Sequence, residues 1–340
     1  MCERVTRRDV LGAAVAGVAG LVFAAKPQAA DGARTQATAA SAPSTQAASK
    51  PALPPWTEPI IDIHQHTNYR GRSNEALLHH QKRMGITKTV LLPSGSNANT
   101  QSTLLGKANG LYAGAGPIDT VVPIAEAHPH EYYFMANEVP DLPHARETIE
   151  SWLKKGAVGI GESKFNLPCD SQEMQVLYQL AADYQVPILM HFQYETFNTG
   201  FENLEKMLKK YPKTQFIGHA QMMWANIDKN PQNVKINYPK GKVERGGLTD
   251  KYLSDYPNFH SDLSAGSGLN AMIRDEDHAR WFIERHQDQL VYGSDCEDVV
   301  GISPRCTGAN MISCVRRLSP SHEVIQKLLY KNAEKLLKLT

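Results

Sequence analysis

The stretch that decides the fold is Pro59-Ile60-Ile61-Asp62-Ile63-His64-Gln65-His66, an apolar run that ends in two histidines. A short run of this kind is typical of a buried parallel strand, although its periodicity is also compatible with a buried helix. Because strand side chains alternate between faces, a strand would direct His64 and His66 to the same side. Two imidazoles on one side form half of a metal site.

Four further apolar runs, 157–162, 186–191, 215–219 and 290–295, each end in one residue that can bind a metal. In order, these end residues are Glu162, His191, His219 and Asp295. A single residue of this type is usually hydrogen-bonded structure. The ordered set, however, stands at the carboxyl ends of predicted strands, where α/β barrels place their chemistry. We therefore predict all four, with His64 and His66, as metal ligands.

The chain contains eight strand-like runs separated mostly by helical patterns. The predicted strands are 60–66, 88–93, 132–139, 157–165, 186–192, 214–221, 258–265 and 289–295, and the predicted helices are 73–84, 142–155, 172–184, 201–211, 275–286 and 321–338. Because parallel strands need crossover connections, this alternation predicts an α/β fold, a closed (β/α)₈ TIM barrel. An open doubly wound sheet is the alternative, but no glycine-rich nucleotide-binding motif follows the first strand.

The first residues differ in composition from the rest. Thr6-Arg7-Arg8, followed by a small-residue apolar stretch over 12–25, resembles a twin-arginine export signal and is shorter than the ~20 residues of a membrane span. We assign 1–30 to this signal peptide, 31–55 to a disordered linker rich in Ala, Ser, Thr and Pro, and 56–340 to the barrel. The mature protein is expected to be periplasmic or extracellular and free of the membrane.

Charge and cysteine content limit the partners. A formal net charge of +1 gives no reason to expect nucleic-acid binding, so a small-molecule substrate is expected, and a homo-oligomer remains compatible with the sequence. An oxidising exterior would favour a disulfide, for which Cys306 and Cys314 are the predicted pair. Cys296 follows Asp295 and, on an alternating strand, would face away from the metal, which favours a packing or disulfide role over a nucleophilic one.

Two predicted connections, 94–131 and 222–257, are longer than a simple barrel requires and would emerge at the ligand-bearing face. They are the predicted substrate loops, with candidate contacts at Asn97, Asn99, Trp224, Arg245 and Tyr252. Asp262 ends the seventh predicted strand and has two equal interpretations. It either orients a ligand histidine or caps the following segment.

The sequence resembles the amidohydrolase superfamily in the order of its predicted ligands and in three motifs. These are Asp62-Ile-His-x-His at the first strand, Gly293-Ser294-Asp295 at the last, and Asn332-Ala-Glu-Lys-Leu-Leu in the final helix. The nearer likeness is the amidohydrolase-related (amidohydrolase 2) family, over roughly 60–339. The resemblance implies one or two divalent ions, and it leaves His219 as a ligand, as a residue that supports a ligand, or as a residue that polarises the substrate. Lys164 is a rival bridge if carboxylated; otherwise it binds a substrate carboxylate or pairs with Glu162.

A divalent ion held by imidazole and carboxylate lowers the pKa of a bound water to ~7, and Asp295 would serve as general base. Zinc is the first choice, with manganese or iron as alternatives. The leading hypothesis is hydrolysis of a C–O or C–N bond in a small ester, lactone or amide. The alternative is non-oxidative decarboxylation of an aromatic acid, although decarboxylases of the resembled family generally lack a carboxylate at the Glu162 position. TatD-like phosphodiester cleavage and a non-enzymatic metal-binding protein are the remaining alternatives.

Overall fold

The computed structural model describes residues 55–96, 109–230 and 232–339. The predicted signal peptide and all but the last residue of the predicted linker lie outside the described residues, as do Asn97 and Asn99. Within the described residues, no helix combines the length and apolar character needed to cross a bilayer.

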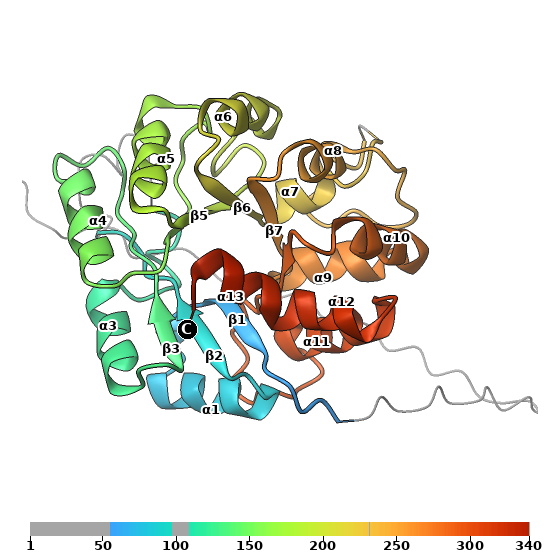
Figure 1. Cartoon of the computed structure of the whole chain (residues 1–340), viewed down its shortest axis with the longest axis horizontal. Helices are drawn as coiled ribbons and strands as arrows, with labels where there is room; N and C mark the ends of the chain where they lie inside the picture. Colours follow the sequence, from blue (N-terminus) through green and yellow to red (C-terminus); the bar gives the residue numbers. More distant parts are fainter. Residues whose placement is uncertain (1–54, 97–108, 231, 340) are drawn as a thin grey trace, which may run out of the picture. The chain divides into compact units, whose positions relative to one another are not determined.

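Eight parallel strands stand at the centre with helices around them, so the predicted (β/α)₈ barrel is confirmed (Figure 1). The strands are β1 (Ile61–Gln65), β2 (Lys88–Leu91), β3 (Tyr132–Phe134), β4 (Ile160–Ser163), β5 (Pro187–His191), β6 (Gln215–His219), β7 (Phe259–Asp262) and β8 (Leu290–Val291). They pair in sequence order, in one group from β1 to β3 and another from β4 to β8. Backbone hydrogen bonds from Ala136 N–H to Gly159 O (2.8 Å) and from Ile63 N–H to Tyr292 O (3.3 Å) join the groups.

The predicted helices are present, although the last is divided into three segments. They are α1 (Asn74–Met84), α4 (Ala145–Lys154), α5 (Gln172–Tyr184), α6 (Leu204–Lys210) preceded by a 3₁₀ turn, α10 (Glu276–His286), α12 (His322–Gln326), a π-helical segment (Lys327–Lys331) and α13 (Asn332–Leu337). Their ends follow local chemistry. Ser73 and Ser171 accept the backbone N–H of Ala76 and Met174, respectively, and Gly85 ends α1 with φ 79°.

Among the described residues, five helices were not predicted from the sequence: α3 (Ile118–Ala127), α7 (Gln221–Ala225), α8 (Leu248–Asp255), α9 (Ala265–Ile273) and α11 (Thr307–Leu318). The two long predicted loops therefore contain α3, α7 and α8. Pro123 obscures the helical pattern of α3, and α7 is too short to show one.

The core has two layers. The larger lies between strands and surrounding helices and contains Phe216, Phe259 and Phe282. The smaller joins inward-facing strand residues such as Ile61, Ile63, Val90 and Ile217 to Ala333, Leu337 and Leu339, so the C-terminal segment packs onto the barrel interior. Polar groups at the carboxyl ends of the strands are consequently held on a rigid apolar base.

Candidate metal centre

The two histidines that end β1 face each other. Their Nε2 atoms are 3.1 Å apart. His64 Nδ1 lies 2.7 Å from Asp262 Oδ2, and His66 Nδ1 lies 2.7 Å from the carbonyl oxygen of Leu92. Because those oxygens accept a hydrogen bond from the N–H at each Nδ1, the neutral rings present Nε2 lone pairs to one another. Two lone pairs at this distance repel unless a proton or a metal ion lies between them.

Glu162 from β4 lies among four imidazoles. Its Oε2 is 3.2 Å from Nε2 of both His64 and His66. Its Oε1 is 2.6 Å from His191 Nδ1 and 3.7 Å from His219 Nε2. Because one carboxylate oxygen faces each pair of histidines, Glu162 has the placement of a bridging ligand.

Two buried atoms in the centre lack any hydrogen-bond partner, namely His219 Nε2 and Asp295 Oδ1. Asp295 Oδ1 lies 3.5 Å from His66 Nε2, and Asp295 Oδ2 lies 3.7 Å from His219 Nε2. Buried polar atoms without partners are costly, and bound metal ions are one way to satisfy them. The residues present therefore fit a divalent cation.

Within this centre, two sets of three donors are close enough to hold an ion: His64 with Glu162 and His219, and His64 with His66 and Asp295. His191 belongs to neither set, because its Nδ1 contacts Glu162 and its Nε2 lies 3.1 Å from Gln193 Oε1. The structure thus brings all six predicted ligands together, with His191 at the edge. Mixed imidazole and carboxylate donors suit zinc, manganese or iron.

Asp262 supports the centre from behind. Its Oδ2 lies 2.7 Å from His64 Nδ1 and 3.2 Å from His219 Nδ1, so one carboxylate orients two ligand rings. Its Oδ1 accepts the backbone N–H of Ser264 at 2.9 Å, just before α9. Asp262 therefore makes the contacts that the first interpretation requires; it also holds the backbone just before α9, although no side chain caps the first turn of that helix.

Burial and charge act in opposite directions here. Burial disfavours the charged form of His64, but the surrounding carboxylates, Asp295 first, raise its pKa well above the ordinary value. Burial likewise opposes ionisation of Glu162, yet the neighbouring histidines, His64 first, hold its pKa well below the usual value. Burial, and then the charge of Lys164, lowers the pKa of His191 to about 4. The centre thus favours positive charge at His64, where a cation would supply it.

The Gly293-Ser294 motif is explained by contacts between β1 and β8. A Cβ on Gly293 would lie 2.5 Å from Asp262 Oδ1 and 2.9 Å from His64 Cβ, so only glycine fits. Asp62 accepts the backbone N–H of Ser294 at 2.8 Å and the amide of Gln81 at 2.8 Å. These contacts fix the backbone that carries His64 and Asp295.

Three of the predicted substrate-contacting residues have side chains that contact other protein groups. Trp224 lies in the helix α7 rather than in a loop, is buried, and donates its Nε1–H to Asp262 O at 3.0 Å. Arg245 is exposed and stacks 4.3 Å from the Trp281 ring on α10. Tyr252 is buried in α8, with its hydroxyl on Phe201 O. Substrate contact by these three residues stays a prediction.

Lys164 lies near the edge of the centre. Its Nζ is 5.3 Å from the centroid of the Phe197 ring, which in turn packs 5.9 Å from the His191 ring. Glu162, rather than Lys164, occupies the bridging position. Lys164 therefore keeps the predicted option of binding a negatively charged substrate group.

Two neighbours of the centre were missed from the sequence. Tyr69 packs edge-on against the His66 ring, with centroids 5.2 Å apart, and the charge of Asp295 raises the Tyr69 pKa. Ser264 Oγ lies 3.0 Å from His219 Nδ1. The three-residue spacing from His66 was the only signal for Tyr69, and Ser264 had none.

The cysteine prediction was wrong. Cys306 and Cys314 are both free; Cys306 precedes α11 and Cys314 lies within it. Eight residues of helix separate the two by about 12 Å. Cys296 instead lies beside Cys306, with 3.6 Å between the sulfur atoms. Cys296 does point away from the centre, but the cause is the left-handed backbone of Asp295 (φ 40°) rather than strand alternation.

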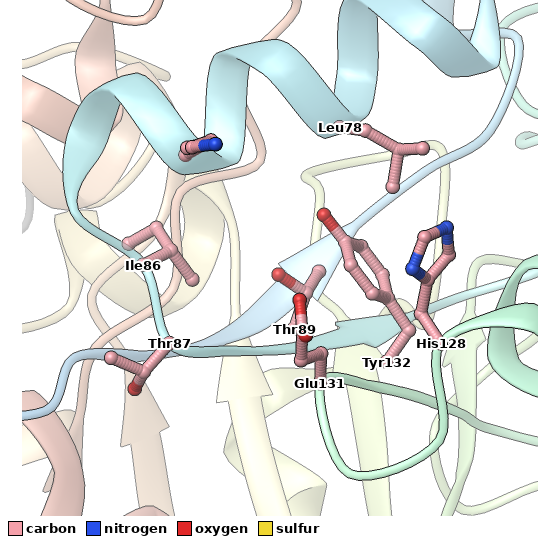
Figure 2. Close-up of a pocket in the computed structure, with 8 residues that line it drawn as sticks. Leu78, Ile86, Thr87, Thr89, His128, Glu131 and Tyr132 are labelled. Carbon is pink, nitrogen blue, oxygen red and sulfur yellow. The ribbon is translucent and has the colours of Figure 1, made fainter.

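A pocket of about 510 Å³ lies away from this centre (Figure 2). Its lining includes Thr87 and Thr89 near the start of β2, and Glu131 and Tyr132 at the start of β3. It therefore opens at the amino ends of strands, where barrels carry structural rather than catalytic residues.

Comparisons with known proteins agree with the geometry. The family model described as Amidohydrolase matches residues 61–339. No curated protein matches the sequence. The chain is similar to 2,6-dihydroxybenzoate decarboxylase from Rhizobium, at 14% identity and a TM-score of 0.52, covering 83% of this chain and 99% of that chain.

Two further solved structures have the same fold. One is a probable 2-pyrone-4,6-dicarboxylic acid hydrolase from Acinetobacter baumannii with citric acid bound (12% identity, TM-score 0.52, 83% of this chain and 100% of that chain). The other is a dihydroxybenzoic acid decarboxylase from a Polaromonas species with bound manganese (15%, 0.50, 83% and 98%). The family model spans most of the sequence, and the strand ends bring together side chains that could hold a metal ion. This chain therefore belongs to the amidohydrolase family of metal-dependent TIM-barrel enzymes.

Proposed function

We propose that this protein is a metal-dependent hydrolase that uses water to cleave a C–O or C–N bond of a small ester, lactone or amide. The observation that supports this proposal is Glu162, whose two oxygens face different histidine pairs beside the unpartnered Oδ1 of Asp295. A divalent cation, when bound, lowers the pKa of water and polarises a carbonyl oxygen. We propose zinc first, while manganese also suits these donors.

Charge counting supports room for more than one cation. Glu162, Asp262 and Asp295 place three carboxylates in contact with the same group of histidines. With neutral histidines, one divalent cation leaves one excess negative charge, and a second leaves one excess positive charge. Three carboxylates are therefore neutralised by between one and two divalent cations, and the charge count by itself favours neither a neutral substrate nor an anion.

The chain's own residues have separate roles in this proposal. Asp295, the most exposed of the six predicted ligands at 11%, accepts the proton of the attacking water and returns it to the leaving group. Asp262 holds His64 and His219 in orientation. Lys164 binds a negative group on the substrate, and the aromatic ring of Phe197 fixes the path of its side chain.

Non-oxidative decarboxylation of an aromatic acid is the second candidate, and the structural comparisons favour it. Most of the similar structures with a named activity are aromatic acid decarboxylases, against one probable hydrolase. At 14% and 15% identity, however, likeness to two of these decarboxylases shows the fold alone. The Glu162 carboxylate is the feature of this chain that favours hydrolysis.

A substrate panel separates the two candidates. The full chain is stripped with a chelator, reloaded with Zn²⁺ or Mn²⁺, and incubated with esters, lactones, amides, hydroxybenzoic acids and a phosphodiester. Acid release from a neutral substrate that disappears on chelation supports hydrolysis. Carbon dioxide release from a hydroxybenzoic acid, without turnover of any ester, lactone or amide, would reject it.

The variant Glu162→Gln tests whether Glu162 bridges two cations. If Glu162 bridges two cations, the variant should bind about one equivalent less metal and lose about 10²-fold in kcat. The matched control is Asp228→Asn, which removes another buried carboxylate, one that pairs with Arg274 at 3.3 Å. Equal metal content and activity in Glu162→Gln and the wild type would exclude the bridging role.

A further inference from the structure

A second group of buried donors lies outside the proposed catalytic centre. It contains His80 on α1, and Cys296 and Cys306, which flank the loop after β8. One donor atom from each lies within 4.8 Å of the others, and all three residues are at most 2% exposed. None of them takes part in the proposed hydrolysis.

The hydrogen bonds of Gln81 determine which nitrogen of His80 carries the proton. The Gln81 amide nitrogen donates to Asp62 Oδ2 (2.8 Å) and Thr89 Oγ1 (2.9 Å). Its Oε1 therefore faces His80 Nδ1, at 2.9 Å, and accepts that N–H. In the neutral ring the lone pair is then on Nε2, which lies 3.5 Å from Cys306 Sγ. An imidazole held by its outer N–H is the usual arrangement of a metal-binding histidine.

The distances fit an ion between the donors. A tetrahedral ion with bonds of about 2.3 Å to sulfur and 2.0 Å to nitrogen separates two thiolates by about 3.8 Å and thiolate from imidazole nitrogen by about 3.5 Å. The observed separations are 3.6 Å between the two sulfur atoms and 3.5 Å between Cys306 Sγ and His80 Nε2. The thioether of Met84 lies 3.5 Å from Cys306 Sγ and adds another soft donor.

We propose that His80, Cys296 and Cys306 form a binding site for a thiophilic cation, Zn²⁺ or Cu⁺, distinct from the catalytic centre. Soft thiolate and thioether ligands select these ions over Mg²⁺, Ca²⁺ or Mn²⁺. The ion would tie α1 to both ends of the loop after β8. Three of the loop residues, Val299, Val300 and Ile302, are exposed, so displacement of the loop gives the ion a route to the buried donors.

Co²⁺ is the first probe, because thiolate ligation gives a charge-transfer absorption that nitrogen and oxygen ligands do not. The full chain, prepared with reductant and stripped of metal, should develop this band on titration with Co²⁺. Cys306→Ser and Cys296→Ala should abolish it and lower the bound metal by one equivalent. Cys314→Ser, which alters another buried cysteine, should retain it. His66→Asn should also retain it, because that residue belongs only to the catalytic centre.

Competition between Zn²⁺ and Cu⁺, with a chromophoric copper chelator, then identifies the preferred ion. Cys306→Ser should weaken the preferred ion at least tenfold, and circular dichroism establishes that each variant is folded. Absence of the thiolate band in the wild type, or its persistence in both folded cysteine variants, overturns the proposal. A disulfide between Cys296 and Cys306 that persists in protein prepared with reductant overturns the proposal as well.

Discussion

Asp295 and Cys296 are neighbours in the chain, yet their side chains belong to different groups of buried donors. Asp295 faces imidazoles and a carboxylate, whereas Cys296 faces a second thiol and His80. The left-handed backbone at Asp295 (φ 40°) separates the two directions. The comparison teaches that one short segment can contribute to two donor groups of different chemistry, because imidazoles and carboxylates lie on one side and two thiols with one imidazole lie on the other.

A shared frame connects the two groups. Gln81 contacts Asp62 through its amide nitrogen and His80 through its amide oxygen. Asp62 in turn accepts the backbone N–H groups of His64 and Ser294. Both sites therefore depend on the same contacts between α1, β1 and the segment after β8, and variants must be chosen that alter one site while leaving this frame intact.

Asp295→Asn should have the largest effect, because it removes the proposed general base from the catalytic centre. The amide keeps the size of the side chain but cannot accept the proton of water, so kcat should fall by about 10³-fold. Metal content should remain near that of the wild type, since His64 and His66 are unchanged. Steady-state kinetics with elemental analysis checks both. Activity within threefold of the wild type would remove Asp295 from the role of base.

Asp262→Asn should have the next largest effect. Asp262 orients His64 and His219 through their Nδ1 atoms, and loss of such support typically weakens metal binding by about 10- to 100-fold. Asp250→Asn is a matched control, because Asp250 makes the same carboxylate–imidazole contact with His286, also at 2.7 Å, but on outer helices. Competition against a metal-sensitive dye measures the difference. Equal affinities in the two variants would show that Asp262 has no special role.

The sequence located the donors at the strand ends because each of these residues ends an apolar run, and strand ends converge in a barrel. Asp295 and His64 are 231 residues apart, yet their order relative to the strands located both. Asp262 was recognised with two interpretations, since a strand-end carboxylate alone does not indicate which rings it contacts. The site residues remain predictions, because only metal and activity measurements test their roles.

The sulfur side was not predictable in the same way. His80 lies on a helix that shows only amphipathic spacing, and the two cysteines are more than 200 residues further along. The sequence pattern does not reveal the helix α11, and the prediction of a disulfide between Cys306 and Cys314 fails because that helix holds the two residues apart. Sites assembled from a helix and a loop have no periodic signal, whereas strand ends do.

The smallest predicted effect is the loss of stability in Asp250→Asn. It measures how much a carboxylate–histidine pair stabilises the fold where no metal site is adjacent. Burial opposes ionisation of Asp250, but hydrogen bonding to His286 lowers its pKa below the ordinary value of 3.8. A carboxyl group with a lowered folded-state pKa stabilises the fold above its unfolded-state pKa, and that contribution is lost as pH falls through the folded-state value. Asp250 is buried, but 12% of its side chain is exposed on the outer helices, so solvent screening should limit the contribution to about 0.5–1 kcal/mol.

Thermal unfolding of Asp250→Asn and the wild type should therefore differ slightly at neutral pH, and the difference should shrink once the pH falls below 3.8. The metal-free form of Asp262→Asn provides the comparison, because its carboxylate pairs with His64 and His219 at buried positions. Its loss should cost more at neutral pH than the loss of Asp250, since removing one partner of a buried pair leaves the other without compensation. If both variants lose the same stability at every pH, burial at the strand ends adds nothing to the carboxylate–imidazole contact, and the two regions differ only in the ions they bind.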